Sequence, residues 1–199
     1  MLVASKSLRL VSKLDKAPQH VKIIAGQWRG TKLPVLPKEG VRPTSNRVRE
    51  TLFNWLQASI EGSHCLDMFA GSGALGFEAV SRGACSATLV DNDPSITEVL
   101  ADQAKRLQAN NIEIVCVDSL QFCLQARTQY DFIFIDPPFS RFNLAEILEK
   151  ISHSNILKDS TLIYIEGPAD HLPEQLPADW HWKRQSKAGD VEYGLIRTS

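Results

Sequence analysis

Between residues 64 and 166 the sequence alternates short β-prone segments with longer amphipathic ones, and this alternation restricts the fold more than any other feature. Runs of apolar and β-branched residues predict strands, and apolar residues at helical spacing predict helices between them. The expected strands lie at about 64–70, 87–91, 112–117, 131–136 and 161–166, and the expected helices near 74–82, 94–109, 119–127 and 143–152. This order is typical of a parallel sheet with helices on both faces.

The C-terminal part of the chain departs from this alternation. Residues 182–187 and 192–197 are both β-prone, and nothing helical separates them. The short segment between them, Ala188-Gly189-Asp190, suits a tight turn, so an antiparallel hairpin is expected. The predicted fold is therefore α/β, with a Rossmann-like sheet of seven strands that is parallel except for this terminal hairpin.

The N-terminal part predicts a small β-hairpin extension. Residues 21–35 contain two short β-prone runs around a turn bounded by glycines. A helix is then expected from Pro43 to about Ala58, because apolar residues recur there on one helical face. We expect a basic arm and hairpin over residues 1–40 and a catalytic domain over residues 41–199.

The composition indicates a globular intracellular protein. Apolar residues make up 43% and charged residues 23%, no apolar run approaches the length that spans a bilayer, and the N-terminus lacks the pattern of a secretory signal. The cysteines and histidines lack metal-ligand spacing, so no metal site and no membrane association are expected. Three of the four cysteines lie in or beside apolar strand-like segments, which suggests reduced core thiols in a cytoplasmic protein; the four are Cys65, Cys85, Cys116 and Cys123.

Charge is distributed unevenly along the chain. Residues 1–50 contain 11 lysines and arginines against three acids, a net charge of +8, while the remainder has a net charge of −9. A basic arm beside an acidic body is common in proteins that bind a polyanion next to a catalytic domain. A solvated basic tail explains the same charge pattern equally well, so charge alone leaves the two interpretations open.

A glycine-rich loop follows the first predicted strand of the sheet. The apolar run at 65–70 leads into Gly71, Gly73 and Gly76 and then into a helix, which matches the fingerprint of dinucleotide-binding loops. Asp91 ends the next strand, 20 residues beyond Gly71, where an acid commonly binds a ribose hydroxyl pair. The spacing predicts a ligand that contains a nucleoside.

An acid just before this loop indicates which nucleoside ligand it binds. Asp67 lies four residues before Gly71, and its carboxylate would repel a pyrophosphate but suit a ligand with an ammonium group. S-adenosylmethionine has that group and no phosphate. Asp118 either accepts from the adenine amino group or caps the following helix, and the sequence leaves both roles open. The candidate cofactor-binding residues are Asp67, Phe69, Gly71, Gly73, Gly76, Asp91, Asn92, Asp118 and Ser119.

The strand predicted at 131–136 ends in Asp136-Pro137-Pro138-Phe139. Prolines cannot donate to a sheet ladder, so the strand stops there and leaves a carboxylate and a ring at the carboxyl edge of the sheet. Asp136 and the Pro137 carbonyl would accept from an exocyclic amino group while Phe139 stacks on the base. An ordinary turn of two prolines is the structural alternative.

With these motifs the chain resembles the class I S-adenosylmethionine-dependent methyltransferases, and most of all the bacterial RsmD family of 16S ribosomal RNA guanine-N2 methyltransferases. The resemblance covers about residues 21–198. It rests on Ile24-Ala25-Gly26 with Gly30-Thr31-Lys32-Leu33, on Arg42-Pro43-Thr44 continuing through Arg47 to Asn54, on the loop from Asp67 to Gly76, and on Asp136-Pro137-Pro138-Phe139.

The resemblance implies methyl transfer to the N2 amino group of one guanine in 16S ribosomal RNA, within an assembling small subunit. Two positions depart from the family: Asp91 stands where glutamate is more frequent, and Asp118-Ser119 where an Asn-Ala pair is common. Catalysis is expected from Asp136, Pro137, Pro138 and Phe139. RNA phosphates are expected to contact Arg29, Lys32, Arg42, Arg47 and Arg49.

Three other functions compete with this one. The same proline turn occurs in adenine-N6 methyltransferases, which would act on adenine in nucleic acid. A nicotinamide dehydrogenase is disfavoured by Asp67 and by the terminal hairpin. A non-catalytic RNA-binding assembly factor would need neither the glycine loop nor Asp136, so both motifs favour an enzyme.

Overall fold

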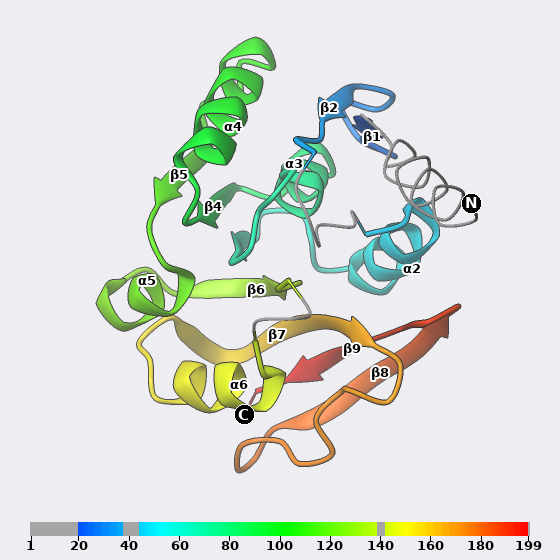
Figure 1. Ribbon diagram of the computed structural model, residues 1–199, viewed down its shortest axis with the longest axis vertical. Coiled ribbons are helices and arrows are strands. Elements are labelled where there is room, and N and C mark those ends of the chain that lie inside the picture. Colours follow the sequence, from blue (N-terminus) through cyan, green and yellow to red (C-terminus); the bar gives the residue numbers. More distant parts are fainter. Residues whose placement is uncertain (1–19, 38–43, 139–141, 199) are drawn as a thin grey trace, which may run out of the picture.

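The computed structural model describes residues 20–37, 44–138 and 142–198, and its centre is a seven-stranded sheet with the order β5-β4-β3-β6-β7-β9-β8 (Figure 1). The strands of this sheet are β3 (His64–Asp67), β4 (Ser86–Asp91), β5 (Ile112–Cys116), β6 (Tyr130–Ile135), β7 (Leu157–Pro168), β8 (His181–Ala188) and β9 (Val191–Arg197). The helices are α2 (Asn46–Leu56), α3 (Ala74–Ser81), α4 (Pro94–Arg106), α5 (Ser119–Gln125) and α6 (Leu144–Ser152).

The pairing of the strands confirms the predicted fold. The five strands β3 to β7 are parallel to one another, and β9 is antiparallel to both β7 and β8. Each of the first four parallel strands is followed by a helix, as the alternation requires. A loop of residues 169–180 takes the place of a helix between β7 and β8.

β7 is longer than the sequence predicted, because it begins at Leu157 rather than near residue 161. The segment Lys158-Asp159-Ser160 resembles a turn in sequence, and Ser160 has a φ of 71°. The sheet accommodates this irregularity because the Thr161 hydroxyl donates to the Tyr130 carbonyl (2.8 Å) and restores the connection to β6. Pairing with β6 and β9 therefore outweighs the local turn preference.

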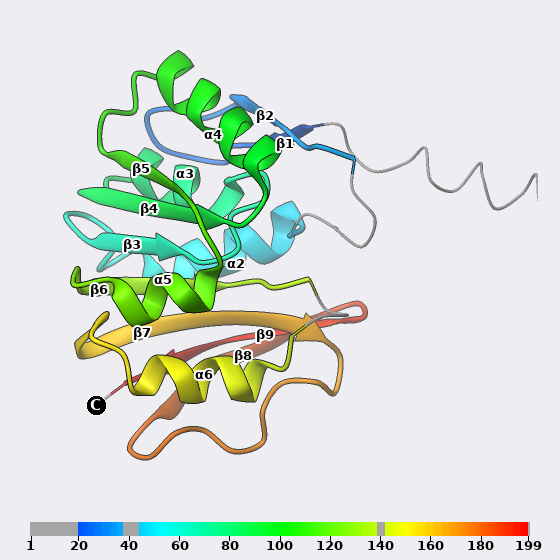
Figure 2. The same cartoon turned by 60° about the vertical axis from the view of Figure 1, so that its left-hand side comes forward.

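Helices cover both faces of the sheet (Figure 2). On one face α2, α3 and α4 pack in a core that includes Phe53, Phe77 and Phe134. On the other face α5 and α6 pack in a second core, to which the loop of residues 169–180 contributes Leu172 and Leu176. No helix in the described part of the chain is long and apolar enough to cross a membrane. All four cysteines are free thiols; Cys65 and Cys123 are buried as expected, whereas Cys85 and Cys116 are exposed.

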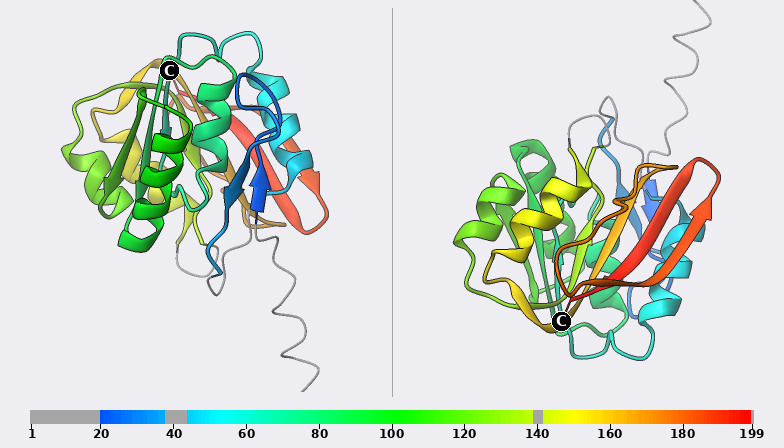
Figure 3. Two further views of the ribbon diagram at one scale, coloured as in Figure 1. Left: turned by 90° about the horizontal axis from the view of Figure 1, so that it is seen from above. Right: turned by 90° about the horizontal axis from the view of Figure 1, so that it is seen from below.

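The predicted N-terminal hairpin forms from β1 (His20–Lys22) and β2 (Lys32–Pro34), and it lies on the face of the sheet that carries α2 and α3 (Figure 3). Its turn is bound to the end of α3: the Gln27 amide donates to the Ser81 carbonyl (2.8 Å). A Cβ at Gly26 would lie 1.7 Å from that same carbonyl oxygen, so only glycine permits this approach. The hairpin is therefore closely packed against the helix that follows the glycine loop.

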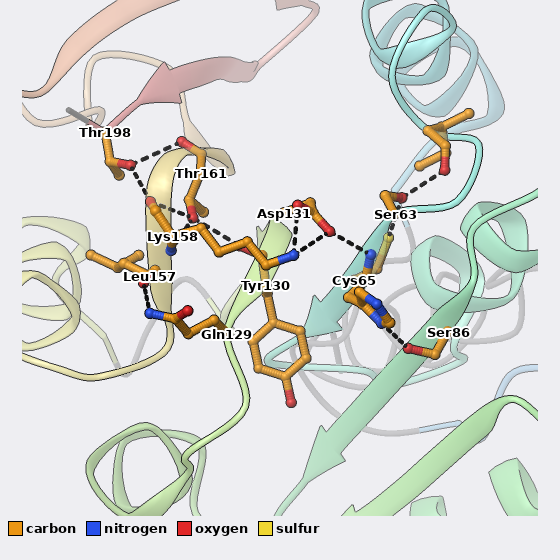
Figure 4. Close-up of polar contacts among 12 residues, drawn as sticks. Ser63, Cys65, Ser86, Gln129, Tyr130, Asp131, Leu157, Lys158, Thr161 and Thr198 are labelled. Carbon is orange, nitrogen blue, oxygen red and sulfur yellow. Dashed lines mark hydrogen bonds and ion pairs between the residues drawn. The ribbon is translucent and has the colours of Figure 1, made fainter.

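The amino edge of the sheet is closed by an ion pair (Figure 4). Asp131, at the start of β6, accepts from Lys158 Nζ at 2.8 Å and from the His64 amide at 2.8 Å. These bonds join β3, β6 and β7 at one end. At the opposite, carboxyl edge the same three strands carry acids, which are described next.

Candidate active site

Three neighbouring strands, β3, β6 and β7, place an acid at the carboxyl edge of the sheet. These acids are Asp67, Asp136 and Glu166. Each comes two residues after a member of the same core cluster, namely Cys65, Phe134 and Tyr164. Because side chains alternate along a strand, all three carboxylates lie on the face covered by α2 and α3.

Asp67 links β3 to the glycine loop. The Gly76 amide donates to Asp67 Oδ2 at 3.0 Å, and the side chain is only 3% exposed. Burial raises the pKa of Asp67 to about 7; the Gly76 bond acts against this shift and the charge of Asp91 adds to it. A carboxylate in this position gains from a cationic ligand, because a positive charge compensates the lost hydration.

The second and third glycines of the loop are required by packing. A Cβ at Gly76 would lie 2.5 Å from Leu89, so this glycine brings α3 close to β4, as the fingerprint predicts. At Gly73 the φ is 72°, and a Cβ would lie 2.6 Å from Phe77 and 2.7 Å from Leu100. A side chain at Gly73 would therefore clash with the protein core, and the predicted contact of Gly73 with the cofactor stays a prediction.

Asp91 is hydrogen-bonded to the glycine loop, with which it was expected to bind one ligand. The Gly71 amide donates to Asp91 Oδ2 at 3.0 Å and the Asp93 amide donates to Oδ1 at 3.0 Å, while Asn92 between them is exposed. In a dinucleotide site the loop amides would donate to a pyrophosphate. Here the Gly71 amide already has an anionic partner.

These donors and acceptors fit S-adenosylmethionine better than a dinucleotide. Two carboxylates, Asp67 and Asp91, flank the loop, and the segment 67–76 contains no lysine or arginine to balance a phosphate. A Cβ at Gly71 would meet only the Phe69 carbonyl, at 3.9 Å, so the loop leaves space at its first glycine. A phosphate-free, cationic nucleoside suits this space.

The remaining candidate cofactor residues have structural partners. Asp118 caps α5, because its Oδ1 accepts from the Leu120 amide (3.0 Å) and the Gln121 amide (2.9 Å). The capping role is therefore present, and the adenine contact stays a prediction. The buried Ser119 hydroxyl donates to the Met68 carbonyl and holds α5 against the loop.

Phe69, in the glycine loop, forms an aromatic pair that links the loop to the segment after the proline turn. Its ring lies 5.0 Å from that of Phe142 at an interplanar angle of 59°. Phe69 is half-buried. Through this pair the cofactor loop and the segment before α6 support each other.

Asp136 follows β6 directly and meets the start of the α2 segment. The buried Thr44 hydroxyl donates to Asp136 Oδ2 at 2.7 Å. Burial raises the pKa of Asp136 well above its ordinary value, and the neighbouring Glu166 raises it further, while the Thr44 bond lowers it. Pro137 is buried and Pro138 half-buried, whereas Phe139 lies outside the described residues. A perturbed carboxyl beside a ligand loop is typical of functional sites.

The sequence reasoning missed three residues around Asp136, namely Thr44, Tyr164 and Glu166. Tyr164 is fully buried and its hydroxyl donates to Glu166 Oε2 at 2.8 Å; burial and the charge of Glu166 raise the pKa of this tyrosine. Glu166 ends a predicted strand, as Asp136 does, and that shared position was the available signal.

The expected RNA-binding residues lie in different parts of the molecule. Arg47 is exposed in the first turn of α2, close in sequence to Thr44 and hence on the side of Asp136. Arg29 and Lys32 are exposed on the hairpin, whose turn packs on the last residue of α3, at the amino edge. Arg42 lies outside the described residues.

The predicted contact of Arg49 with RNA is corrected, because the Arg49 side chain is completely buried. Its Nη2 donates to the Lys22 carbonyl (2.8 Å), and Nη1 lies 3.6 Å from Glu78 Oε2. Burial lowers the pKa of Arg49, and the charge of Glu78 counteracts this. Arg49 therefore binds the hairpin to α2 and α3 instead of contacting RNA. The sequence placed it in an arginine cluster, but helical spacing puts it on the same face as Phe53.

Glu78 and Ser81 were also missed, and they complete this connection. Glu78 accepts from the amides of Ile24 (2.7 Å) and Ala25 (3.0 Å), and from Arg82 Nε at 2.7 Å. The hairpin is therefore anchored by side chains of α3 that no short motif marks.

Known proteins similar to this chain share its length and much of its sequence. Ribosomal RNA small subunit methyltransferase D of Escherichia coli is 43% identical over 187 residues, which covers 92% of this chain and 94% of that protein. The protein of the same name from Haemophilus influenzae is 45% identical, over 91% of this chain and 95% of its own length. A solved structure of a putative methyltransferase from Escherichia coli matches with a TM-score of 0.82 and 43% identity, over 90% of this chain and 98% of that chain.

The family model described as "Conserved hypothetical protein 95" matches residues 21–197, nearly the range of the resemblance read from the motifs. The class I methyltransferase fold expected from these motifs is confirmed. The chain belongs to this family, the RsmD family.

Proposed function

We propose that this protein transfers a methyl group from S-adenosylmethionine to the exocyclic N2 of a guanine in 16S ribosomal RNA. The observation that carries the proposal is the position of Asp136, which is held by Thr44 beside the strand that bears the glycine loop. The family relatives are named as methyltransferases of small-subunit ribosomal RNA, which supports the same substrate.

The cofactor would be held by acids and backbone amides. Asp67 would balance the ammonium group, and Asp91 would accept from the ribose hydroxyls, with Phe69 beside the loop. Bound S-adenosylmethionine supplies an electrophilic methyl group. The acidic lining explains why a nicotinamide dinucleotide is a poor alternative.

Asp136 would act on the substrate amino group. Its Oδ2 is bonded to Thr44, so Oδ1 would accept one amino hydrogen and the Pro137 carbonyl the other. Positive charge develops on N2 during methyl transfer, and a carboxylate in a water-poor site stabilises that charge strongly. Pro138 would stiffen the turn, and Phe139 would hold the base in line.

The guanine must leave its helix to reach this turn, because N2 is inaccessible within a stacked duplex. Arg47 would hold a phosphate close to the flipped nucleotide, and Arg29 and Lys32 would hold more distant phosphates. An assembling small subunit, in the cytoplasm, is the proposed substrate.

The proposal is tested by supplying radioactive S-adenosylmethionine, the purified protein, and small subunits from cells that lack it. Mass analysis of the digested RNA should show N2-methylguanosine at one position. Parallel reactions with free 16S RNA distinguish the particle from naked RNA. N6-methyladenosine as the product, or no methylated nucleoside on either substrate, would overturn the proposal.

A further inference from the structure

Strand β8 is the outermost strand on one side of the seven-stranded sheet, and it is basic within an acidic part of the chain (Figure 3). Residues 51–199 have a net charge of −9, yet residues 180–189 contain three lysines and arginines and no acid. These three are Lys183, Arg184 and Lys187. The RNA contacts expected from the sequence all precede residue 50, so they gave this strand no role.

Two of these three cations have no paired acid. Lys187 Nζ lies 3.2 Å from Glu192 Oε1, so its charge is already matched. Lys183 and Arg184 are exposed, and neither forms an ion pair with any residue that the structure describes. Neighbouring exposed cations of this kind attract an anion with several charges.

The pairing of β8 with β9 shows to which face of the sheet Arg184 belongs. Arg184 pairs with Leu195, and Ser186 pairs with Tyr193. Directly paired residues lie on the same face, and both partners on β9 belong to the core beneath α2 and α3. Trp55 of α2 stacks on Tyr193, with 5.6 Å between the ring centres, so this helix lies next to the hairpin. Arg184 is therefore on the face that carries the three acids of the candidate active site.

The strand pairing also gives the distance from the proline turn to β8. Glu166 lies next to Asp136 and pairs with Tyr193 of β9. Tyr193 in turn pairs with Ser186 of β8. Asp136 and Ser186 are separated by three strand spacings of about 4.8 Å each, roughly 14 Å in all. Arg184 follows two residues away on β8, within reach of nucleotides that flank a base bound at Asp136.

We propose that Lys183 and Arg184 bind phosphates of the RNA that flanks the target guanine, so that the RNA crosses β9 and β8 next to the active site. We call these two residues the β8 surface. The inference rests on the proposed function and adds a binding surface to it. Arg29 and Lys32 lie at the amino edge, whereas the β8 surface lies on the catalytic face. Phosphate contacts of this kind position a nucleic acid without reading its bases.

A charged edge strand also has a structural explanation. Lysine on an edge strand prevents another chain from adding to the sheet. That protection depends on the presence of charge and not on its sign, whereas phosphate binding requires positive charge. A second copy of this chain is a poor occupant, because two basic β8 strands would repel each other. Reversing the sign of both charges therefore separates the two roles.

The test compares the wild type with Lys183→Glu/Arg184→Glu in binding to small subunits from cells that lack the protein. The affinity should fall by about tenfold or more, and the slope of log affinity against log salt should flatten by about one to two units. KM for the subunits should rise while kcat stays within about twofold, because these contacts are equal in the ground state and the transition state. Binding of S-adenosylhomocysteine, measured by calorimetry, should stay unchanged and checks the fold.

Two further double variants serve as controls. Arg127→Glu/Lys150→Glu changes the net charge equally, but Arg127 precedes β6 at the amino edge and Lys150 is exposed in the last turn of α6, on the other face. It should keep most of the affinity and the slope. Lys183→Gln/Arg184→Gln should flatten the slope as the reversal does, with a smaller loss of affinity because no repulsion is added. Sedimentation measures the oligomeric state of each variant.

A folded Lys183→Glu/Arg184→Glu variant with the affinity and salt slope of the wild type would overturn the inference. An equal loss of affinity in Arg127→Glu/Lys150→Glu would also overturn it, because net charge alone would then explain the effect. If the reversed variant does not fold, the glutamine variant decides: a flattened slope supports the inference, and an unchanged slope, with or without self-association, overturns it. Absence of methylation by the wild type would instead overturn the proposed function, since binding is measured separately.

Discussion

Strand β6 is bounded by two aspartates, Asp131 at its amino end and Asp136 just after its carboxyl end, and these lie in opposite electrostatic environments. For Asp131 burial would raise the pKa, but the bonds from Lys158 and the His64 amide outweigh burial and lower it. For Asp136 burial and the adjacent Glu166 raise the pKa, and the Thr44 hydroxyl only reduces this shift.

The comparison shows that the neighbours of an acid decide its role. Asp131 has a cation at 2.8 Å and holds strands together, so its charge stabilises the fold. Asp136 has an acid beside it, so its charged form is costly until a substrate supplies donors. Perturbation of this second kind is typical of sites that bind or react.

Glu78 tests whether pairing with a cation or burial decides that an acid has a structural role. Its side chain is completely buried, and unlike Asp136 it is paired with two cations, Arg49 and Arg82. Glu78→Ala should lower the free energy of unfolding by about 3–5 kcal/mol, because it leaves the buried Arg49 without its counter-charge. Denaturant unfolding measures this.

A matched variant sharpens the Glu78 test. Glu78→Gln keeps an oxygen for the Ile24 and Ala25 amides, so it should lose less stability than Glu78→Ala. A loss below about 1 kcal/mol in Glu78→Ala would contradict a structural role for the buried pair, since removal of one partner from such pairs is strongly destabilising.

The two aspartates themselves should respond differently to the same substitution. Asp136→Ala should lower kcat by about 10²–10³-fold, the scale for loss of one charge-stabilising group, while affinity for S-adenosylhomocysteine stays nearly constant. Asp136→Asn should be milder, because the amide oxygen still accepts a hydrogen bond. Single-turnover methylation measures the rate.

Asp131→Ala is the control for this experiment. It should leave kcat within about threefold and cost about 1 kcal/mol of stability, since the Asp131–Lys158 pair is about one-third exposed. Equal effects of Asp131→Ala and Asp136→Ala on kcat would contradict a catalytic role for Asp136 and a structural role for Asp131.

The pH dependence of stability should follow the raised pKa at the carboxyl edge. The pKa of Asp67 is about 7 in the folded protein and 3.8 ordinarily, so the folded state retains a proton that the unfolded state loses. The stabilisation is complete below pH 4 and is lost as pH rises through 7. Without cofactor, stability should fall on the order of 2 kcal/mol from pH 5 to pH 8.

Asp67→Asn should flatten this pH dependence, because the amide oxygen keeps the Gly76 bond without ionising. Saturating S-adenosylmethionine should also flatten it, since the ammonium group favours the ionised carboxylate. Chemical unfolding at each pH measures both effects. A stability that rises between pH 5 and pH 8 would show that other groups control the titration.

The smallest effects concern RNA phosphates at the two edges of the sheet. Arg47→Ala, on the side of Asp136, should weaken RNA binding and flatten the slope of log affinity against log salt by up to about one unit. Arg29→Ala, at the amino edge, should flatten it less. Binding titrations at several salt concentrations measure the slopes. A larger change of slope in Arg29→Ala than in Arg47→Ala would indicate that the RNA binds mainly across the hairpin.

Local sequence determined most of the architecture and the cofactor loop. Strand and helix periodicity depend on neighbouring residues, so β4, β6, α3 and α6 formed close to their predicted positions. The positions of Gly76 and Asp91 beside the glycine loop also followed from spacing, because strand, turn and helix have standard lengths. The turn at Asp136 followed from the inability of proline to continue a sheet.

Only the tertiary structure decided which charges face one another. Arg47 and Arg49 are two residues apart, yet one is exposed and the other is buried against Glu78, because α2 has its apolar face on the sheet. Asp136 and Glu166 are far apart in sequence and become neighbours through the pairing of β6 with β7. Electrostatic environment depends on such long-range contacts, and a pattern of residue types along the chain does not contain them.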